Sequence, residues 1–153
     1  MTENSPNSAW ATAGILVGRL VFAAVFLMGF AFKLMDITGT AAYIAAAGFP
    51  IPTLLAWAAA LFELSLVVCL VTGAFFIEAT LLAAAYVLFL AFAFHGPSHW
   101  QGNQAEFGFF VDHFTFIAGL MFAAVHGPGI RLAVNYGVLG QRHYTKRVSA
   151  TSR

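Results

Sequence analysis

A single arginine inside a long apolar run places the strongest constraint on this chain. Residues Gly14–Lys33 read GILVGRLVFAAVFLMGFAFK and are long enough to cross a bilayer, which needs about 20 helical residues. Arg19 lies well inside this run, and a charge near the bilayer centre costs roughly 2.5–3.5 kcal/mol on insertion scales. Such a side chain normally faces the interior of a helix bundle and finds an anionic partner there. The sequence therefore predicts a bundle in which Arg19 meets a buried acid.

The composition indicates an integral membrane protein. The chain is 61% hydrophobic and only 8% charged, whereas ordinary globular domains are about 25% charged. A net charge of +1, with no basic patch among the aromatic residues, gives no support for nucleic-acid binding. Cys69 is the only cysteine, so no disulfide can form within the chain. Thiol–disulfide chemistry carried by this chain alone is therefore not expected.

Four apolar segments have spanning or near-spanning length: Ala11–Lys33, Leu54–Thr72, Ala79–His95 and Phe107–His126. Backbone groups in lipid must be satisfied within their own segment, so each of these is predicted to be a helix. Residues Thr38–Ala47 suit a short helix lying at the membrane interface. The predicted fold class is an all-α membrane protein, a four-transmembrane-helix bundle with a short interfacial helix between helices one and two.

The charge distribution predicts the domain organisation and the orientation. We expect a polar N-terminal tail (1–10), a membrane domain (11–129) and a basic tail (130–153). Cytoplasmic loops carry an excess of Lys and Arg. The basic residues of the tail are Arg131, Arg142, Lys146, Arg147 and Arg153. With an even number of spans, both termini are expected on the cytoplasmic side.

Depth estimates predict a polar pair in the core of the bundle. At 1.5 Å per residue, Arg19 lies about 12 Å along the first helix from Ala11. Glu63 lies roughly 13 Å along the second helix from the outer face. In a hydrocarbon core about 30 Å thick, these distances from opposite faces place the two residues within about 5 Å of each other in depth, so Arg19 and Glu63 are predicted to pair. The pair would serve either as a structural clamp or as part of a binding or proton-transfer site.

A second group of polar residues is expected near the outer face of the membrane. Its members are Lys33, His95, Asp112 and His113. The donors and acceptors in this group could hydrogen-bond a quinone carbonyl, although contacts with lipid would explain them equally well. No H-x-x-x-H or H-E-x-x-H pattern occurs on a continuous helix, so no metal site is assigned. A haem is not indicated either, because nothing in the sequence demands facing axial ligands.

Short motifs recur along the chain in a characteristic order. They are Gly18-Arg19, Gly29, Lys33, Gly39-Thr40, Tyr43, Ala47-Gly48-Phe49-Pro50, Glu63, Gly73, Phe94-His95 and Gly127-Pro128-Gly129. In this order and spacing, over about residues 13–132, the chain resembles the DoxX family of small four-helix membrane proteins. It departs from the family at Asp112-His113, where relatives commonly carry Lys-Asn. Ser65-Leu66 and Ile77-Glu78 also replace glycines and a basic residue.

The resemblance implies a protein of the bacterial inner membrane that belongs to a redox system. Relatives include subunits of a thiosulfate:quinone oxidoreductase and a membrane partner of a superoxide dismutase and a thiol-handling enzyme. The leading hypothesis is therefore a membrane subunit or anchor of a quinone-linked system. The alternative is a non-enzymatic scaffold or small-molecule carrier whose buried charges are structural locks. Proton-coupled transport would need a homo-oligomer, and no catalytic residue is assigned.

Overall fold

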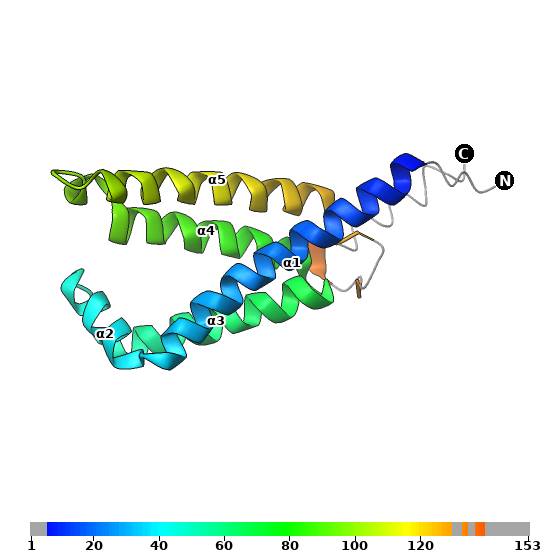
Figure 1. The fold of residues 1–153 in the computed structure, drawn as a ribbon. Coiled ribbons are helices and arrows are strands. Elements are labelled where there is room, and N and C mark those ends of the chain that lie inside the picture. Colours follow the sequence, from blue (N-terminus) through cyan, green and yellow to red (C-terminus); the bar gives the residue numbers. More distant parts are fainter. Residues whose placement is uncertain (1–5, 130–132, 135–136, 140–153) are drawn as a thin grey trace.

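The structure, a computed structural model, describes residues 6–129, 133–134 and 137–139. In chain order its elements are α1 (Pro6–Met35), α2 (Ile37–Ala46), α3 (Pro52–Thr72), α4 (Phe76–His95), the 3-10 turn η1 (Pro97–His99) and α5 (Gln104–His126) (Figure 1). No strand occurs among these described residues, which confirms the prediction of an all-α fold. The predicted basic tail (130–153) lies almost entirely outside the described part of the chain.

The helices α1, α3, α4 and α5 are each long and apolar enough to cross a membrane. The chain is therefore a membrane protein, as its composition predicts, and α2 is the predicted short helix between the first two spans. Helix α1 begins at Pro6, inside the predicted polar tail, and α5 begins before the predicted Phe107. The reason is that hydropathy marks only the apolar part of a helix, whereas polar residues can extend it beyond the hydrocarbon region.

The helices pack as two pairs that meet at one end. Helix α1 crosses α3, α4 lies along α5, and α2 covers the start of α3 (Figure 1). We call the end where α1 finishes and α3 begins the α2 end, and the end where α3 finishes and α4 begins the Pro128 end. Helices α3 and α4 lie close together at the Pro128 end and diverge toward the α2 end (Figure 1). This divergence positions the candidate site described below.

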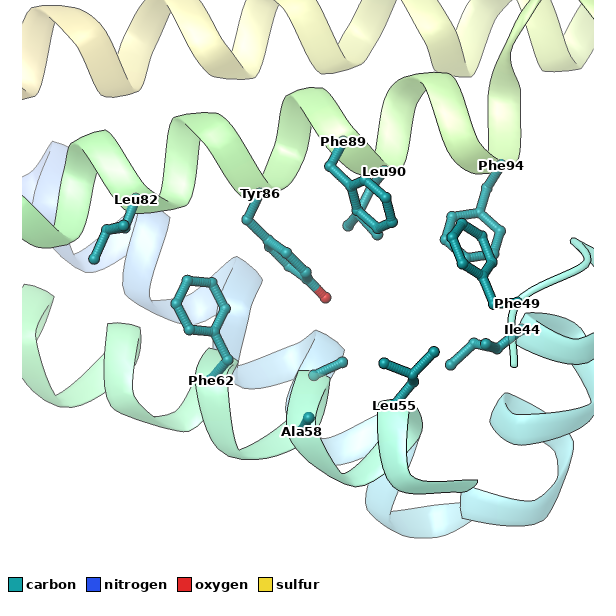
Figure 2. Close-up of a pocket in the computed structure, with 11 residues that line it drawn as sticks. Ile44, Phe49, Leu55, Ala58, Phe62, Leu82, Tyr86, Phe89, Leu90 and Phe94 are labelled. Atoms are coloured by element: carbon teal, nitrogen blue, oxygen red, sulfur yellow. The ribbon is translucent and has the colours of Figure 1, made fainter. Parts of the chain in front are cut away.

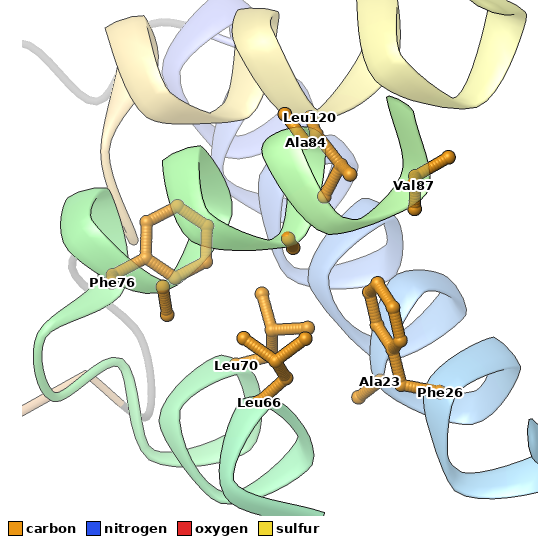
Figure 3. Close-up of a cluster of buried hydrophobic side chains, with 10 residues drawn as sticks. Ala23, Phe26, Leu66, Leu70, Phe76, Ala84, Val87 and Leu120 are labelled. Carbon is orange, nitrogen blue, oxygen red and sulfur yellow. The ribbon is translucent and has the colours of Figure 1, made fainter. Parts of the chain in front are cut away.

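Two apolar clusters hold the helices together. The main cluster takes residues from all four spanning helices: Ala23, Phe26, Leu66, Leu70, Phe76, Ala79, Ala83, Ala84, Val87 and Leu120 (Figure 3). Alanines on the buried face of α4 allow the neighbouring helices to approach closely. A smaller cluster at the α2 end joins Ala41 and Ile44 of α2 to Ala56 of α3. Helix α2 therefore packs through its apolar face against the start of α3.

Asp36 caps the start of α2. Its side chain accepts hydrogen bonds from the Gly39 amide at 2.8 Å and from the Thr38 hydroxyl at 3.0 Å. A β-carbon on Gly39 would lie 2.1 Å from the Asp36 carboxylate, so a side chain at this position would displace the cap. These hydrogen bonds to the ionised form lower the pKa of Asp36. Asp36 therefore begins α2 immediately after α1 ends.

We expect Asp36→Ala to loosen α2, because the cap that satisfies its first amides is lost. Amide hydrogen exchange over residues 37–46 at neutral pH should be faster than in the wild type. Asp36→Asn is the matched control, since asparagine caps equally well and does not titrate. Because the folded pKa is lowered, the stabilisation by Asp36 is present above the ordinary aspartate pKa and is lost as the pH falls through the folded value. Asp36→Asn should remove that acid sensitivity; equal exchange in all three proteins would contradict a capping role.

Candidate functional site

A cavity of about 560 Å³ lies between α3 and α4 at the α2 end. Its lining is apolar apart from one phenol and comprises Ile44, Phe49, Leu55, Ala58, Ala59, Phe62, Leu82, Tyr86, Phe89, Leu90 and Phe94 (Figure 2). Ligand pockets in proteins typically measure about 300–1,000 Å³. Ala58, Leu82 and Phe89 are exposed, and all three lie on spanning helices. The open side of the cavity therefore faces lipid.

Aromatic rings form much of the cavity wall. Phe49 contacts Phe89 edge-on, with ring centroids 5.7 Å apart, and lies 6.0 Å from Phe94. Between the two helices, Phe62 of α3 meets Tyr86 of α4 edge-on, with ring centroids 5.1 Å apart. Rings in these edge-on and tilted arrangements leave faces and edges available to a planar guest. The wall is therefore suited to a flat, apolar or amphipathic molecule.

The phenol in the wall belongs to a buried polar group, which we call the Lys33–Glu63–Tyr86 triad. The Tyr86 hydroxyl lies 2.9 Å from Glu63 Oε1. Lys33 Nζ lies 2.8 Å from Glu63 Oε1 and 2.9 Å from Oε2. Glu63 is only 4% exposed, so its charge is tolerated at this depth because an ammonium and a phenol both contact it. Helices α1, α3 and α4 each contribute one member.

Gly29 makes this arrangement possible from the α1 side. A β-carbon at Gly29 would lie 3.1 Å from Glu63 Oε2, tighter than most real β-carbon contacts. The absence of a side chain therefore lets the Glu63 carboxylate lie against α1, one helical turn before Lys33. From this place the Lys33 ammonium reaches back along its own helix to the carboxylate.

The hydrogen bonds of the triad define where its protons lie. Lys33 and Tyr86 together make three donor contacts to the two carboxylate oxygens. An ammonium can only donate, and a carboxylate without a proton can only accept. The tyrosine hydroxyl therefore gives its hydrogen to Glu63. The lone pairs of the Tyr86 oxygen remain for any molecule in the cavity.

The pairing differs from the one predicted from the sequence, which placed Arg19 opposite Glu63. The ion-pair partner of Glu63 is Lys33. Arg19 lies at the Pro128 end instead, where Nε donates to the Leu70 carbonyl at 3.1 Å and Nη2 to the Val71 carbonyl at 2.9 Å. Its Nη1 donates to the Pro128 carbonyl at 2.7 Å. Arg19 thus joins the end of α3 to the segment that follows α5.

Side-chain direction explains this correction. Side chains on a helix tilt toward the N-terminus of that helix. Because α1 and α3 run antiparallel, Arg19 reaches toward the Pro128 end, whereas Glu63 reaches toward the α2 end. Glu63 consequently meets Lys33, which the sequence had assigned to the outer group.

The remaining members of the predicted outer group lie where α4 meets α5. The His95 and His113 rings are 5.1 Å apart, and His95 Nδ1 lies 2.6 Å from Glu106 Oε2. Asp112 is exposed. Among the described residues, no three His, Cys, Asp or Glu side chains could together hold a metal ion. The structure therefore separates Lys33 from this group, and a functional role for its members stays a prediction.

Sequence reasoning missed Tyr86 and with it the cavity. A usable signal was present, because Tyr86 is the only tyrosine within the four predicted spans. A buried tyrosine hydroxyl usually finds a hydrogen-bond partner, and Glu63 is the acid in the neighbouring span. The cavity itself had no such signal. It depends on the angle between α3 and α4, which hydropathy does not specify.

The comparison with known families covers the part of the chain that builds this site. A family model described as DoxX matches residues 14–96, which contain all three members of the triad and every residue of the cavity wall. No curated protein and no solved structure matches the chain. Helix α5 and the residues Asp112 and His113 lie beyond the matched segment. Since the match spans more than half of the sequence, the chain belongs to the DoxX family.

Proposed function

We propose that this protein is the membrane subunit or anchor of a quinone-linked redox system and that its cavity binds the quinone. The observation that carries the proposal is a cavity with an aromatic wall, an open side facing lipid and a single polar side chain in its lining. Quinones are planar, dissolve in the bilayer and carry oxygen atoms only on the ring. A cavity with this lining matches such a molecule better than a charged metabolite, which would need several polar partners.

The proposal extends to location and organisation. We place the membrane domain (11–129) in the cytoplasmic membrane of a bacterium, with both termini on the cytoplasmic side. The basic residues of the tail (130–153) support this orientation. A partner enzyme that exchanges electrons with the quinone would then dock on the bundle. The match to the DoxX family is the support for a redox setting.

A second candidate is a scaffold in which the buried charges are structural locks. The contacts of Arg19 favour this alternative, because its guanidinium donates hydrogen bonds to the backbone carbonyls of Leu70, Val71 and Pro128. A cation at that place joins the end of α3 to the segment after α5. The two candidates differ in one measurable property, since only the first requires a ligand in the cavity.

The test is ligand binding in nanodiscs with a blocked cavity. Ala59 lines the cavity on α3, and Ala59→Phe should fill the space beside Tyr86. We expect Ala59→Phe to weaken the binding of a decyl-substituted benzoquinone by roughly tenfold or more, measured by quenching of tryptophan fluorescence. Ala85→Phe is the matched control, because Ala85 is exposed on α4 and does not line the cavity. If the quinone binds neither the wild type nor the control, the scaffold alternative holds.

A further inference from the structure

We infer that the cavity selects a ligand that donates a hydrogen bond, and hence binds the reduced hydroquinone more tightly than the quinone. This inference rests on the proposed function, since it assumes that the cavity binds a molecule of the quinone class. It adds which redox form of the ligand binds more tightly and which atom of the protein causes the difference in affinity. The deciding atom is the hydroxyl oxygen of Tyr86, the one polar side chain among the described residues that line the cavity.

The first step is the direction of the hydrogen bond from Tyr86. Lys33 Nζ contacts both oxygens of Glu63, at 2.8 and 2.9 Å, and Tyr86 contacts Oε1 at 2.9 Å. With an ammonium on both of its oxygens, Glu63 is an ionised carboxylate and has no proton to give. A phenol has one hydrogen, and at Tyr86 that hydrogen points to Glu63.

The second step is what the cavity then offers to a guest. Figure 2 shows the Tyr86 ring reaching from α4 toward α3 with its oxygen between the two walls. Once its hydrogen is used by Glu63, this oxygen can only accept a hydrogen bond. Every other side chain in the lining is a hydrocarbon. Among the side chains of the described residues, the cavity therefore presents one acceptor and no donor.

The third step compares the two redox forms of the guest. A hydroquinone carries hydroxyl groups, and one of them can donate to the Tyr86 oxygen. A quinone carries carbonyl groups, which can only accept, so its oxygen would face another acceptor. Binding a quinone there would require Tyr86 to turn its hydrogen away from Glu63. Leaving a buried polar group without its partner reduces affinity by roughly tenfold or more.

The consequence is a bias toward one side of the redox reaction. A protein that binds the reduced form more tightly makes the bound quinone easier to reduce, because binding and reduction are thermodynamically linked. The triad supplies this bias through its fixed proton arrangement.

The experiment uses a pair of probes that do not undergo redox chemistry under the assay conditions. The first is para-decylphenol, which can donate a hydrogen bond, and the second is para-decylanisole, in which a methyl group replaces that hydrogen. In nanodiscs, the wild-type protein should bind the phenol roughly tenfold more tightly than the anisole. Tyr86→Phe removes the acceptor, so it should bind both probes with equal affinity. Phe89→Leu, a change in the wall without a polar atom, should weaken both probes by the same factor.

The outcomes separate this inference from the proposed function. If the wild type binds both probes equally, or if Tyr86→Phe keeps the preference, selection by Tyr86 is wrong although the cavity still binds ligands. If neither probe nor the benzoquinone binds, the proposed function fails as well. The wild-type comparison decides the matter even if Tyr86→Phe does not fold. The same preference should appear with the decyl-substituted hydroquinone and quinone measured under anaerobic conditions.

Discussion

Replacing Lys33 with methionine is expected to lower the free energy of unfolding by roughly 3–5 kcal/mol, the cost of leaving one partner of a buried ion pair uncompensated. Glu63 would be left with Tyr86 alone, deep in a spanning helix where its short side chain cannot reach the interface. Glu63→Leu should cost less, nearer to 3 kcal/mol, because the Lys33 side chain lies close to the end of α1 and can extend toward water. Unfolding by sodium dodecyl sulfate in mixed micelles, followed by circular dichroism, measures both changes.

The double replacement Lys33→Met with Glu63→Leu distinguishes a pairwise interaction from two separate effects. Removing both charges together should restore most of the stability, because no buried charge then remains. Ser65→Leu is the control on the same helix; Ser65 is exposed, and its replacement should change the free energy by less than about 0.5 kcal/mol. Additive losses in the double variant would mean that Lys33 and Glu63 are not coupled.

The second large effect is expected at Arg19. Arg19→Leu should lower the free energy of unfolding by roughly 3 kcal/mol, because hydrogen bonds from a charged donor contribute about 1.5–3 kcal/mol each and are not additive. Arg19 is 3% exposed, and its guanidinium carbon lies 5.7 Å from the centroid of the Phe76 ring. Its loss would leave the carbonyl groups of Leu70 and Val71 without this donor at the last turn of α3.

Arg19→Lys provides the comparison, because it keeps the charge and loses the planar fork. An ammonium at this place can still interact with the negative end of the α3 dipole. It cannot reach three carbonyls with the same geometry, so the loss should lie between those of the wild type and Arg19→Leu. The unfolding assay in mixed micelles applies here too. If Arg19→Lys and Arg19→Leu lower the free energy of unfolding equally, the positive charge at this position does not stabilise the Pro128 end of the bundle.

The sequence was sufficient to predict the elements of the fold because the physics that defines them is local. Each spanning helix must satisfy its own backbone in lipid, so apolar length alone identifies α1, α3, α4 and α5. The short helix α2 was predicted from the residues between two spans. The exact starts of the helices were less accurate, since polar residues such as Gln104 continue a helix beyond its apolar part.

The candidate site was less predictable because it depends on how helices face one another. Depth along a helix suggested that Arg19 would meet Glu63, but opposite side-chain directions on antiparallel helices carry the two apart. The same side-chain directions predict that Glu63 and Lys33 approach each other. Tyr86 could have been found as an isolated phenol in an apolar span. The divergence of α3 and α4, which creates the cavity, had no local signature at all.

The contacts of Arg19 have a mechanical consequence for the bundle. They tie α3 and the segment after α5 together at one end, while α3 and α4 diverge toward the other end, where the cavity lies between them. At this same end only residues 73–75 connect α3 to α4, so a relative tilt of the two helices would pivot here. Over a helix of about 30 Å, a tilt of about 5° moves the free ends by roughly 2.6 Å. A small change in the angle between α3 and α4 at this end would therefore widen or narrow the mouth of the cavity at the other end.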